Sequence, residues 1–423
     1  MQHRLVVIGS LYENIQLVLD AKRRGYYTIV CDGYKNGHSK MIADKYYDID
    51  IRKTDEIAKI CIDEKADGIL GSFSDLVFEK VTEIADKAGL SWYVSAKKLK
   101  YYRDKKQAKD LLRSLGVSVP ENRLISRDFS NKDIEGLTFP LVVKPSNGWG
   151  SKGIFVVNDP DELRQFAVKT ADISHSETVL VEEYSKGGEY NITSFLAEGK
   201  VYVISCGDRE KTRSEDKTIP RLSRIFYDTK KHDDIIEAAR VTLQKFADAT
   251  GQRSGVLSMQ CFYYNDTLTV CEIAGRILAY EHDIIGAHSG LNIPQLLLDC
   301  VYDVDSLKRK LIESRSFKPQ KIYTRMYFFA QDGVYIDNMD NVYRLCTHDK
   351  LTDNLIFYNE GETVDNSSFR SYFATFSFAA DSIAEMEEIT RYFADNMKVF
   401  SVNGENIIYP IVIDNDRNRN IAE

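Results

Sequence analysis

The chain has 423 residues, which is too long for one hydrophobic core and predicts two to four domains. Its composition is that of an ordinary soluble protein, with 43% hydrophobic and 28% charged residues and no apolar run of the length of a signal peptide or membrane span. The net charge of -8 argues against nucleic acid or an anionic membrane as the main partner. We therefore expect a cytoplasmic protein whose basic clusters bind a local anion.

The chain contains 7 cysteines, and no two of them form a Cys-x-x-Cys pair. Most lie inside apolar runs, which predicts reduced, buried thiols rather than zinc ligands or disulfides. They are Cys31, Cys61, Cys206, Cys261, Cys271, Cys300 and Cys346.

The N-terminal part of the chain alternates strand and helix. RLVVIG at residues 4–9 predicts a buried strand, residues 10–24 a helix that ends at Gly25, and TIVCD at residues 28–32 a second strand. DGIL at residues 67–70 adds another strand, and the order predicts a parallel sheet. Ligands bind beyond the carboxyl ends of such strands, so the polar and glycine residues there share one rim, although each could also be a turn or cap residue. They are Gly9, Ser10, Asp32, Ser72 and Asp75.

Residues 103–120 predict an amphipathic helix that carries Lys105, Lys106 and Lys109 and is followed by a turn at Pro120. From there to about residue 206 the chain is mostly strands. ITSFLAE and KVYVISC, joined by Gly199, alternate in the manner of a hairpin. We expect a small α+β lobe over about 120–206 that serves as a mobile lid.

The most informative stretch of this lobe is FPLVVKPSNGWGSKGIFVV at residues 139–157. It predicts a strand that ends near Lys144, a glycine-rich loop and a second strand. Glycines let consecutive backbone N–H groups approach a phosphate, and Lys144 adds a cation beside them. The dinucleotide fingerprint fails because no helix follows, and a P-loop fails because Ile154 stands where its lysine should be. The HRD and DFG tripeptides of protein kinases do not occur in the sequence, and a plain surface turn is the alternative interpretation.

A second charged cluster lies in VEEYSKGGEY at residues 181–190, at the end of a strand of buried type. Its acids are Glu182, Glu183 and Glu189, and they lie beside Lys186 and two glycines. A solvated turn explains this segment taken alone. Its combination with Lys144 and the glycine loop favours a hinge that binds a purine edge and a ribose.

Residues 233–249 predict a helix, followed by the strands GVLSMQCFYY and LTVCEIAGR around a turn at residues 265–266. Gln260 and Glu272 fall at corresponding depths on these paired strands, with Arg276 beyond them. From residue 317 onward short aromatic strands precede the helix SIAEMEEITRYFADNM, which predicts a terminal α+β lobe.

In this order the segments resemble those of ATP-grasp enzymes, in the branch of carboxylate–amine ligases, biotin carboxylase and the carbamoyl-phosphate synthase large subunit. The resemblance rests on the Asp104-Lys105 pair, the lysine and glycine loop, the VEEY and GGE hinge, and the final strand E-I-x-x-R. It implies an α/β protein with an α+β lid. A Rossmann-like pre-ATP-grasp domain would span residues 1–102, the ATP-grasp domain 103–315 with its lid lobe, and a C-terminal α+β lobe 316–423.

The resemblance also implies a nucleotide site. Lys105 and Lys144 would contact the phosphates, and backbone amides of the glycine loop would cover the γ-phosphate. Glu182, with the backbone of the next residues, would recognise adenine, and Glu189 would bind the ribose hydroxyls. The implied loop and hinge residues are Gly148, Gly150, Ser151 and Gly153, and Glu183, Tyr184 and Ser185.

The family's metal ligands are two carboxylates on adjacent strands and an asparagine two residues further on. The corresponding residues here are Gln260, Glu272 and Ala274, so only one of them is the standard ligand. Mg²⁺ can be held by one carboxylate plus nucleotide phosphates, and Gln260 can offer its amide oxygen. We expect weaker metal binding, or compensation by Glu281 or Asp283. These two acids could instead bind a substrate amine or cap a helix N-terminus.

Two arginines complete the implied site. Arg276 matches the family's arginine that holds the acyl phosphate and the substrate carboxylate. Arg209, just after the strand VYVISC, is expected to stabilise the phosphates, although a solvated loop is the alternative. Residues 211–224 are rich in cations and are expected to order over the substrate.

The function implied is that of an ATP-dependent ligase, which activates a small carboxylate as an acyl phosphate for attack by an amine. Its cofactors would be ATP and Mg²⁺ or Mn²⁺, and its partners a small-molecule carboxylate and amine, with no nucleic acid or membrane partner. A homodimer is the family's usual assembly. The alternatives are carbamoyl-phosphate synthase-like carboxyphosphate chemistry and a non-catalytic nucleotide-binding module with a degraded metal site.

Overall fold

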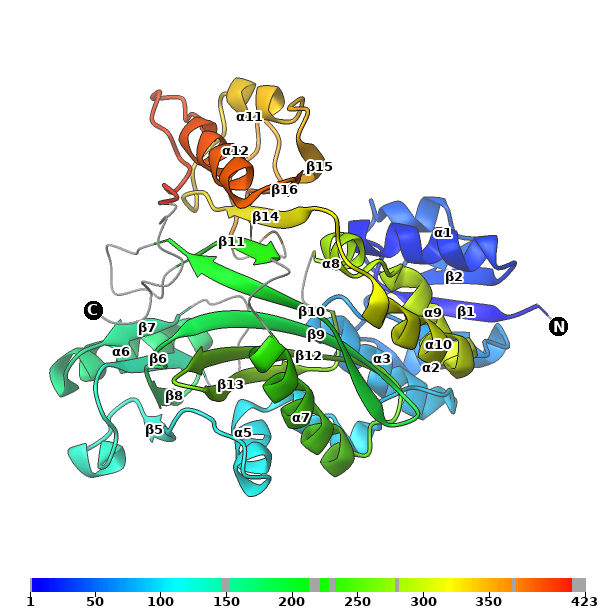
Figure 1. Cartoon of the computed structure of the whole chain (residues 1–423), viewed down its shortest axis with the longest axis horizontal. Helices are drawn as coiled ribbons and strands as arrows, with labels where there is room; N and C mark the ends of the chain where they lie inside the picture. The colour runs from blue at the N-terminus through cyan, green and yellow to red at the C-terminus, as the bar shows by residue number, and fades with distance from the viewer. Residues whose placement is uncertain are drawn as a thin grey trace.

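The structure is a computed structural model that describes residues 2–145, 153–212, 221–227, 233–277, 281–366, 370 and 372–412. Three of the implied loop residues, Gly148, Gly150 and Ser151, lie outside the described residues, as do residues 213–220 of the expected substrate loop. Figure 1 shows an N-terminal unit at one end of the molecule, a small sheet at the other end, and a long central sheet that leads to the C-terminal part.

The N-terminal unit is a parallel sheet of strand order β3-β2-β1-β4. Figure 1 places α1 on one face of this sheet and α2 and α3 on the other. The parallel pairing of β1 with β2 confirms the predicted βαβ opening. Asp32 follows β2 and accepts hydrogen bonds from the backbone nitrogen and the hydroxyl of Ser10, both at 2.7 Å, so these two rim residues do meet. The elements are β1 (Arg4–Ile8), η1 (Tyr12–Asn14), α1 (Ile15–Arg23), β2 (Tyr27–Cys31), η2 (His38–Met41), β3 (Lys45–Tyr47), α2 (Thr54–Asp63), β4 (Gly68–Leu70), α3 (Asp75–Ala88), η3 (Ala96–Lys98), α4 (Lys100–Arg103) and α5 (Lys105–Ser114).

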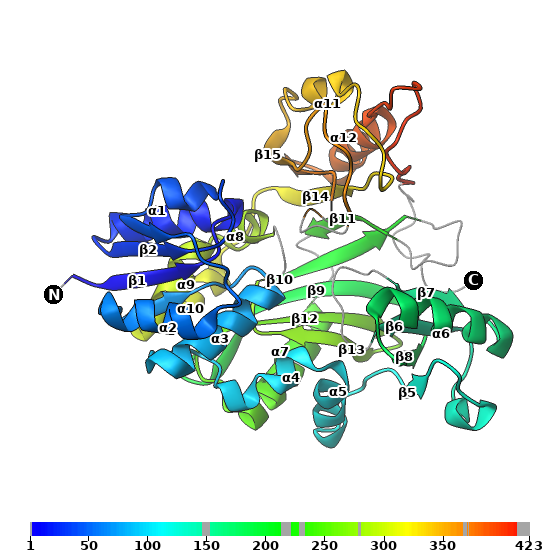
Figure 2. The same ribbon diagram turned by 180° about the vertical axis from the view of Figure 1, so that it is seen from behind.

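A separate antiparallel sheet of order β5-β8-β6-β7 forms what we call the lid sheet, residues 122–183. Val143 on β6 lies opposite Phe155 on β7, so the glycine loop joins two paired strands, as predicted. Helix α6 covers this sheet (Figure 2) and begins at Asp159, whose side chain accepts hydrogen bonds from the first turn. The elements are β5 (Asn122–Ser126), η4 (Asn131–Ile134), β6 (Leu141–Pro145), β7 (Phe155–Val157), α6 (Pro160–Ser174) and β8 (Thr178–Glu183).

The central sheet has eight strands in the order β13-β12-β9-β10-β11-β14-β16-β15. The predicted hairpin around Gly199 is confirmed as β9 and β10, but it belongs to this sheet, whereas the sequence placed it in the lid lobe. The physical reason is that nearly all of β9 is buried between β10 and β12, so it needs a partner strand on each edge. The elements are β9 (Gly188–Ala197), β10 (Lys200–Lys211), β11 (Leu222–Tyr227), α7 (Asp233–Thr250), β12 (Gly255–Tyr264) and β13 (Thr267–Ala274).

The C-terminal strands continue the same sheet without a break. β11 pairs with β10 on one side and with β14 on the other, so hydrogen bonding runs across residue 316. A second apolar core lies between this end of the sheet and α12 and contains Phe376, Phe378 and Phe393. The elements are α8 (His282–Ser289), α9 (Ile293–Tyr302), α10 (Val304–Glu313), η5 (Ser314–Ser316), β14 (Ile322–Phe328), α11 (Asp340–Leu345), β15 (Leu351–Ile356), β16 (Ala374–Ala380) and α12 (Ile383–Asn396).

The cysteine prediction is confirmed, since all of them are free thiols and all but Cys271 and Cys346 are buried. Within the described ranges, no helix is both long enough and apolar enough to cross a membrane.

Candidate active site

One face of the central sheet carries rows of polar side chains. Residues that lie opposite each other on paired strands project from the same face. The register places Glu272 of β13 opposite Gln260 of β12, and Gln260 opposite Asn191 of β9. The predicted correspondence of Gln260 and Glu272 is therefore confirmed. The neighbouring row is Ala274, Ser258, Thr193 and Ser205.

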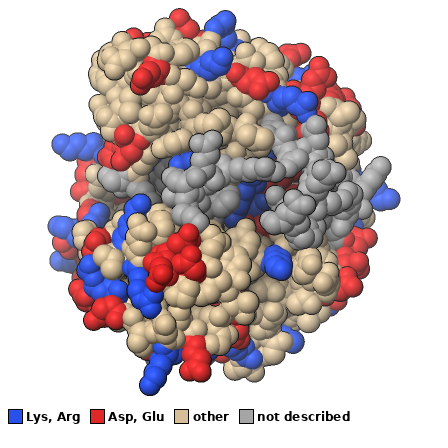
Figure 3. Space-filling view, turned by 90° about the vertical axis from the view of Figure 1, so that its left-hand side faces the viewer, with Lys and Arg blue, Asp and Glu red and all other residues tan. Residues whose placement is uncertain are grey.

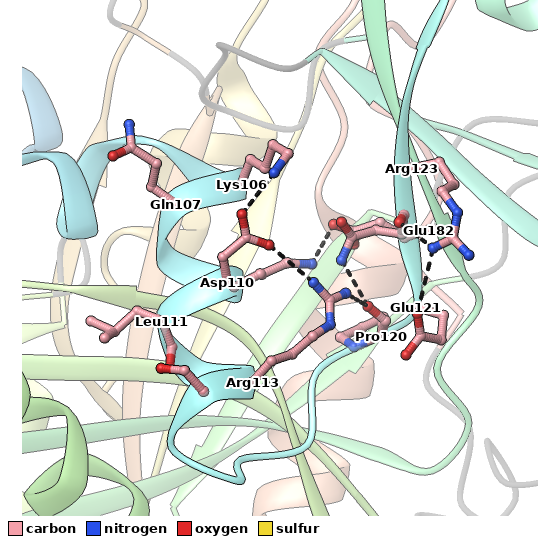
Figure 4. Close-up of polar contacts among 12 residues, drawn as sticks. Lys106, Gln107, Asp110, Leu111, Arg113, Pro120, Glu121, Arg123 and Glu182 are labelled. Atoms are coloured by element: carbon pink, nitrogen blue, oxygen red, sulfur yellow. Dashed lines mark hydrogen bonds and ion pairs between the residues drawn. The ribbon is translucent and has the colours of Figure 1, made fainter. Parts of the chain in front are cut away.

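Glu182 lies at the junction of the lid sheet and helix α5, and it binds two ammonium groups. Lys144 of β6 donates to its Oε2 at 2.6 Å, and Lys109 of α5 donates to its Oε1. All three side chains are buried. Figure 4 shows Glu182 facing α5, with Arg113 of that helix reaching the carbonyl of Pro120. Helix α5 and the lid sheet are thus joined through charge as well as through the chain.

The pKa values in this cluster follow from burial and charge. Burial opposes ionisation of Glu182, but the ammonium groups of Lys144 and Lys109 outweigh it and hold its pKa at about 2. Burial, together with the charge of Lys144, lowers the pKa of Lys109 to about 8. Burial also lowers the pKa of Lys105, whose charge interacts with Lys144 and Glu272. Figure 3, which looks onto the end of the molecule that carries the lid sheet, shows Lys and Arg side chains near its centre.

The hinge after β8 is held by backbone hydrogen bonds. The amide of Glu183 donates to the carbonyl of Glu121 at 2.9 Å, and the amide of Tyr184 donates to the carbonyl of Pro140 at 3.0 Å. The Glu183 carboxylate accepts from the amide of Thr138 at 2.8 Å. Two of the backbone groups that the resemblance assigns to adenine are therefore used in the lid sheet.

Glu189, at the start of β9, is the centre of a second cluster. Arg209 of β10 donates to its Oε1 at 2.7 Å, and Lys211 and the amide of Gln260 also contact it. Burial opposes ionisation, but Lys211 and Arg209 lower the pKa of Glu189. The structure therefore brings Glu189, Arg209 and Gln260 together.

Glu272 is an acid surrounded by three cations from other elements. Its charge interacts with Lys105, Lys144 and Arg276. Among the residues that the structure describes, its carboxylate has no hydrogen bond or ion pair, and the residue is half-buried. The described ranges contain no group of three or more His, Cys, Asp or Glu residues placed to hold a metal ion.

Arg276, which follows β13, is tied to the N-terminal unit. Its Nε and Nη2 donate to the two carboxylate oxygens of Asp75 at 2.9 and 2.8 Å. Burial opposes the charge, but Asp75 outweighs it and raises the pKa of Arg276. Asp75 belongs to the predicted rim, so the rim and the end of β13 meet in one site.

The two acids considered as compensating ligands have different partners. Asp283 is 2.7 Å from Arg325, which also binds Asp353 at 2.9 Å. Glu281 instead accepts from Asn191 at 3.1 Å and from the hydroxyl of Tyr227 at 2.9 Å. Both acids therefore contact side chains of the central sheet, but only Glu281 reaches Asn191, which lies opposite Gln260.

Sequence reasoning did not assign Lys109, Asn191 or Tyr227 to the site. Lys109 is four residues from Lys105 on α5, a spacing that puts both on one helix face. Asn191 is two residues from Glu189 on β9, and alternate residues of a strand share a face. Both could have been found by extending the periodicity from a neighbour, but Tyr227 had no such signal.

Comparison with known proteins gives a consistent result. Residues 137–281 match the family model described as ATP-grasp domain. The formate-dependent phosphoribosylglycinamide formyltransferase of Nitratiruptor sp. is 20% identical over 278 residues, which cover 64% of this chain and 69% of that protein. The carbamoyl phosphate synthase large chain of Clostridium perfringens is 23% identical over 305 residues, which cover 67% of this chain but only 28% of that protein.

A solved structure extends the similarity over nearly the whole chain. The L-amino acid ligase from Bacillus licheniformis superposes with a TM-score of 0.78 and 18% identity, covering 95% of this chain and 99% of that one. At this level of identity the superposition shows a shared fold, which includes the N-terminal parallel sheet, the lid sheet and the central sheet.

Proposed function

We propose, from the premise that this chain belongs to the ATP-grasp superfamily, that it is an ATP-dependent ligase. The γ-phosphoryl group of ATP would pass to a small carboxylate, with release of ADP. An amine would then attack the acyl carbon of the acyl phosphate, lose a proton to solvent and release phosphate. The observation that supports this most strongly is that the charges of Lys144 and Arg276 both interact with Glu272, whose carboxylate makes no hydrogen bond or ion pair with the described residues.

The roles follow from the positions of the charges. Phosphoryl transfer depends on positioning and on cations that stabilise charge on the phosphoryl oxygens. Lys144 supplies such a cation at the end of β6, Lys105 one at the start of α5, and Arg276 one after β13. Arg209 adds another beside Glu189. We assign Lys144, Arg276 and Arg209 to the reacting groups, and Glu189 to the ribose.

The donor set suits one hard divalent cation. Glu272 offers two carboxylate oxygens that no described residue binds. Gln260 lies directly opposite it, and its amide nitrogen is turned to Glu189, so its amide oxygen remains for a ligand. Mg²⁺ prefers such oxygen ligands and is often completed by phosphates and water. When bound, it would neutralise charge on the phosphates. We assign Glu272 and Gln260 to this role.

The test is ADP release by the purified protein with Mg²⁺ or Mn²⁺ across amino acids and other small carboxylates, offered singly and in pairs with amines. We expect release that depends on one carboxylate and falls at least about 100-fold in Glu272→Ala. The Glu272 carboxylate makes no hydrogen bond or ion pair with described residues and interacts with Lys105, Lys144 and Arg276 only at longer range, so the melting temperature should fall by no more than about 4 °C. Glu237→Ala on α7 is the matched control, since that acid is exposed and, within the described ranges, pairs only with Arg240. Unchanged turnover in Glu272→Ala would rule out its assignment.

A second candidate is a nucleotide-binding module without catalysis. It is favoured by Gln260 and Ala274, which bring no charge to a site where the resemblance implies metal ligands. Tight ATP binding by a protein that releases no ADP with any acid would support it. Release that depends on bicarbonate alone would instead support carboxyphosphate chemistry.

A further inference from the structure

Glu281 precedes helix α8 at its N-cap position, yet its side chain makes no hydrogen bond to the first turn of that helix. It turns instead toward the central sheet, where Asn191 donates to both carboxylate oxygens at 3.1 and 3.3 Å. The hydroxyls of Tyr227 and Tyr327 donate from 2.9 and 3.4 Å. Helix capping therefore does not explain why an acid stands here.

The environment of Glu281 is unusual for a carboxylate. It is only 3% exposed, and all the donors given above are neutral groups. Within the described part of the chain it forms no ion pair, although Arg209 and Arg325 lie near enough to interact with it at longer range. Burial raises its pKa. A buried carboxylate without a direct cationic partner is costly, and an added cation would complete it.

An independent observation on the same face of the sheet also indicates a polar ligand. Thr193, Ser205 and Ser258 lie side by side on β9, β10 and β12, one row from Asn191. Each is at most 3% exposed, and none of the three hydroxyls has a hydrogen-bond partner among the residues that the structure describes. Leaving a buried hydroxyl unsatisfied costs about 1–3 kcal/mol, so the row is suited to polar atoms of a ligand.

The remaining walls are aromatic and cationic. Gly207 leaves room for the ring of Tyr227, which crosses β10 toward Glu281, since a Cβ at Gly207 would lie 2.8 Å from that ring. The ring of Tyr372 lies 5.0 Å from that of Tyr327. The charge of Arg276 interacts with both Glu272 and Glu281, so Arg276 is within electrostatic range of both acids.

We propose that Glu281 binds the ammonium group of the acid substrate, so that the carboxylate activated by this protein belongs to an amino acid. The inference rests on the proposed function for the other end of that molecule, whose carboxylate would face Arg276 and Glu272. The ammonium would give Glu281 its charge partner, while Tyr227 and Tyr327 present hydroxyls and aromatic rings beside it. The row of hydroxyls on β9, β10 and β12 would meet the polar atoms next to the ammonium.

The experiment compares each amino acid with its des-amino acid, such as alanine with propionate and phenylalanine with 3-phenylpropionate. ADP release and calorimetric binding in the presence of a non-hydrolysable ATP analogue are both measured. We expect the wild type to prefer one amino acid over its des-amino acid by at least about 100-fold, because a site built for a polar group rejects the analogue that lacks it. In Glu281→Gln that preference should fall at least about 10-fold while the affinity for the ATP analogue changes less than about 2-fold.

Two further variants make the result decisive. Tyr227→Phe removes one hydroxyl donor to Glu281 without changing the shape of the ring, and it should reduce the preference in the same direction by a smaller factor. Glu387→Gln changes a carboxylate in an ion pair with Arg224 in the C-terminal part and should leave the preference unchanged. Equal use of both acids by the wild type, or an unaltered preference in both pocket variants, overturns the inference.

The binding measurement separates this inference from the proposed function. If no acid stimulates ADP release but an amino acid binds to the wild type and not to Glu281→Gln, the ligase proposal fails and the ammonium site stands. If a carboxylate without an amino group drives turnover and no amino acid binds, the ligase stands and the ammonium site fails.

Discussion

At the scale of the residue, Glu182 joins two buried lysines that come from different parts of the chain. Lys109 precedes it by 73 positions and Lys144 by 38. A carboxylate held between two ammonium groups keeps both lysines oriented, and Lys144 is the one that lies next to the glycine loop. We therefore regard Glu182 as a positioning residue for Lys144, the cation that we propose binds phosphate, in addition to its implied contact with adenine.

This arrangement predicts a dependence of stability on pH. The pKa of Glu182 falls from its ordinary value of 4.5 to about 2 in the folded protein. Its contribution to the free energy of unfolding is therefore present above pH 4.5 and is lost as the pH falls toward 2, by about 3 kcal/mol in all. Urea unfolding between pH 6 and pH 2 should show that Glu182→Gln loses about 3 kcal/mol less than the wild type over this interval.

The control for this titration is Glu121→Gln. The Glu121 side chain is 56% exposed, and its ion pair with Arg123 is long, at 3.6 Å. Its free energy of unfolding should have the same pH dependence as that of the wild type. At neutral pH Glu182→Gln should also be less stable than Glu121→Gln, because it leaves Lys109 and Lys144 buried without their anion. Identical pH curves for Glu182→Gln and the wild type would contradict this account of the cluster.

At the level of single strands, β10 carries the glycine that leaves room for the ring of Tyr227. The strand crosses the middle of the central sheet, and its Gly207 lies opposite Asn191. A side chain at this position would meet Ile225 at 2.7 Å and the ring of Tyr227 at 2.8 Å. The absence of a Cβ there is what lets Tyr227 reach Glu281.

Gly207→Ala is therefore expected to displace the Tyr227 ring. We predict a loss of about 1–3 kcal/mol in the free energy of unfolding, which is typical of overpacking a well-filled interior. The larger effect should be on KM for the acid substrate, and the affinity for nucleotide should stay within about 2-fold of the wild type. The double variant Gly207→Ala with Tyr227→Phe tests the cause. If the Tyr227 ring is the group displaced, the effects of the two changes on KM should not add, because each of them removes the contact between the Tyr227 hydroxyl and Glu281.

Several elements were predictable because their signals are local. The apolar alternation around Gly199 predicted a hairpin, and the apolar strands on either side of the glycine loop predicted β6 and β7. The assignment of that hairpin to a sheet was not predictable in this way. Whether β9 joins β8 or β12 depends on which strand edges remain open after folding, and nothing in the residues of β9 reports this.

At the scale of the whole molecule, the central sheet links the proposed nucleotide site to the C-terminal part. Arg224 of β11 is fully buried and binds Glu387 at 2.9 Å and Thr390 at 2.7 Å, both on α12. It also contacts Glu210 of β10. The C-terminal part is therefore tied to the core by backbone pairing, by apolar packing and by this ionic network.

We predict that a chain ending at residue 316 does not fold to a stable form. Without β14, strand β11 would become an unpaired edge of the sheet. Phe226, which is buried in the second core, would be exposed. Circular dichroism and denaturant unfolding of the shortened chain should show no cooperative transition, and the protein should aggregate. A cooperative transition with the stability of the full chain would show that residues 317–423 form an independent unit.

The sequence by itself determined the parallel opening of the N-terminal unit, the strand pair around the glycine loop and the alignment of Gln260 with Glu272. These features follow from periodicity and turn chemistry within short segments, where neighbouring residues carry the information. The contact of Arg276 with Asp75, 201 positions away, and the turn of Glu281 from its helix to the sheet arise only when the separate elements pack together. Contacts of this kind depend on how separate elements pack and on which charges burial forces to find partners, and no local pattern encodes that outcome.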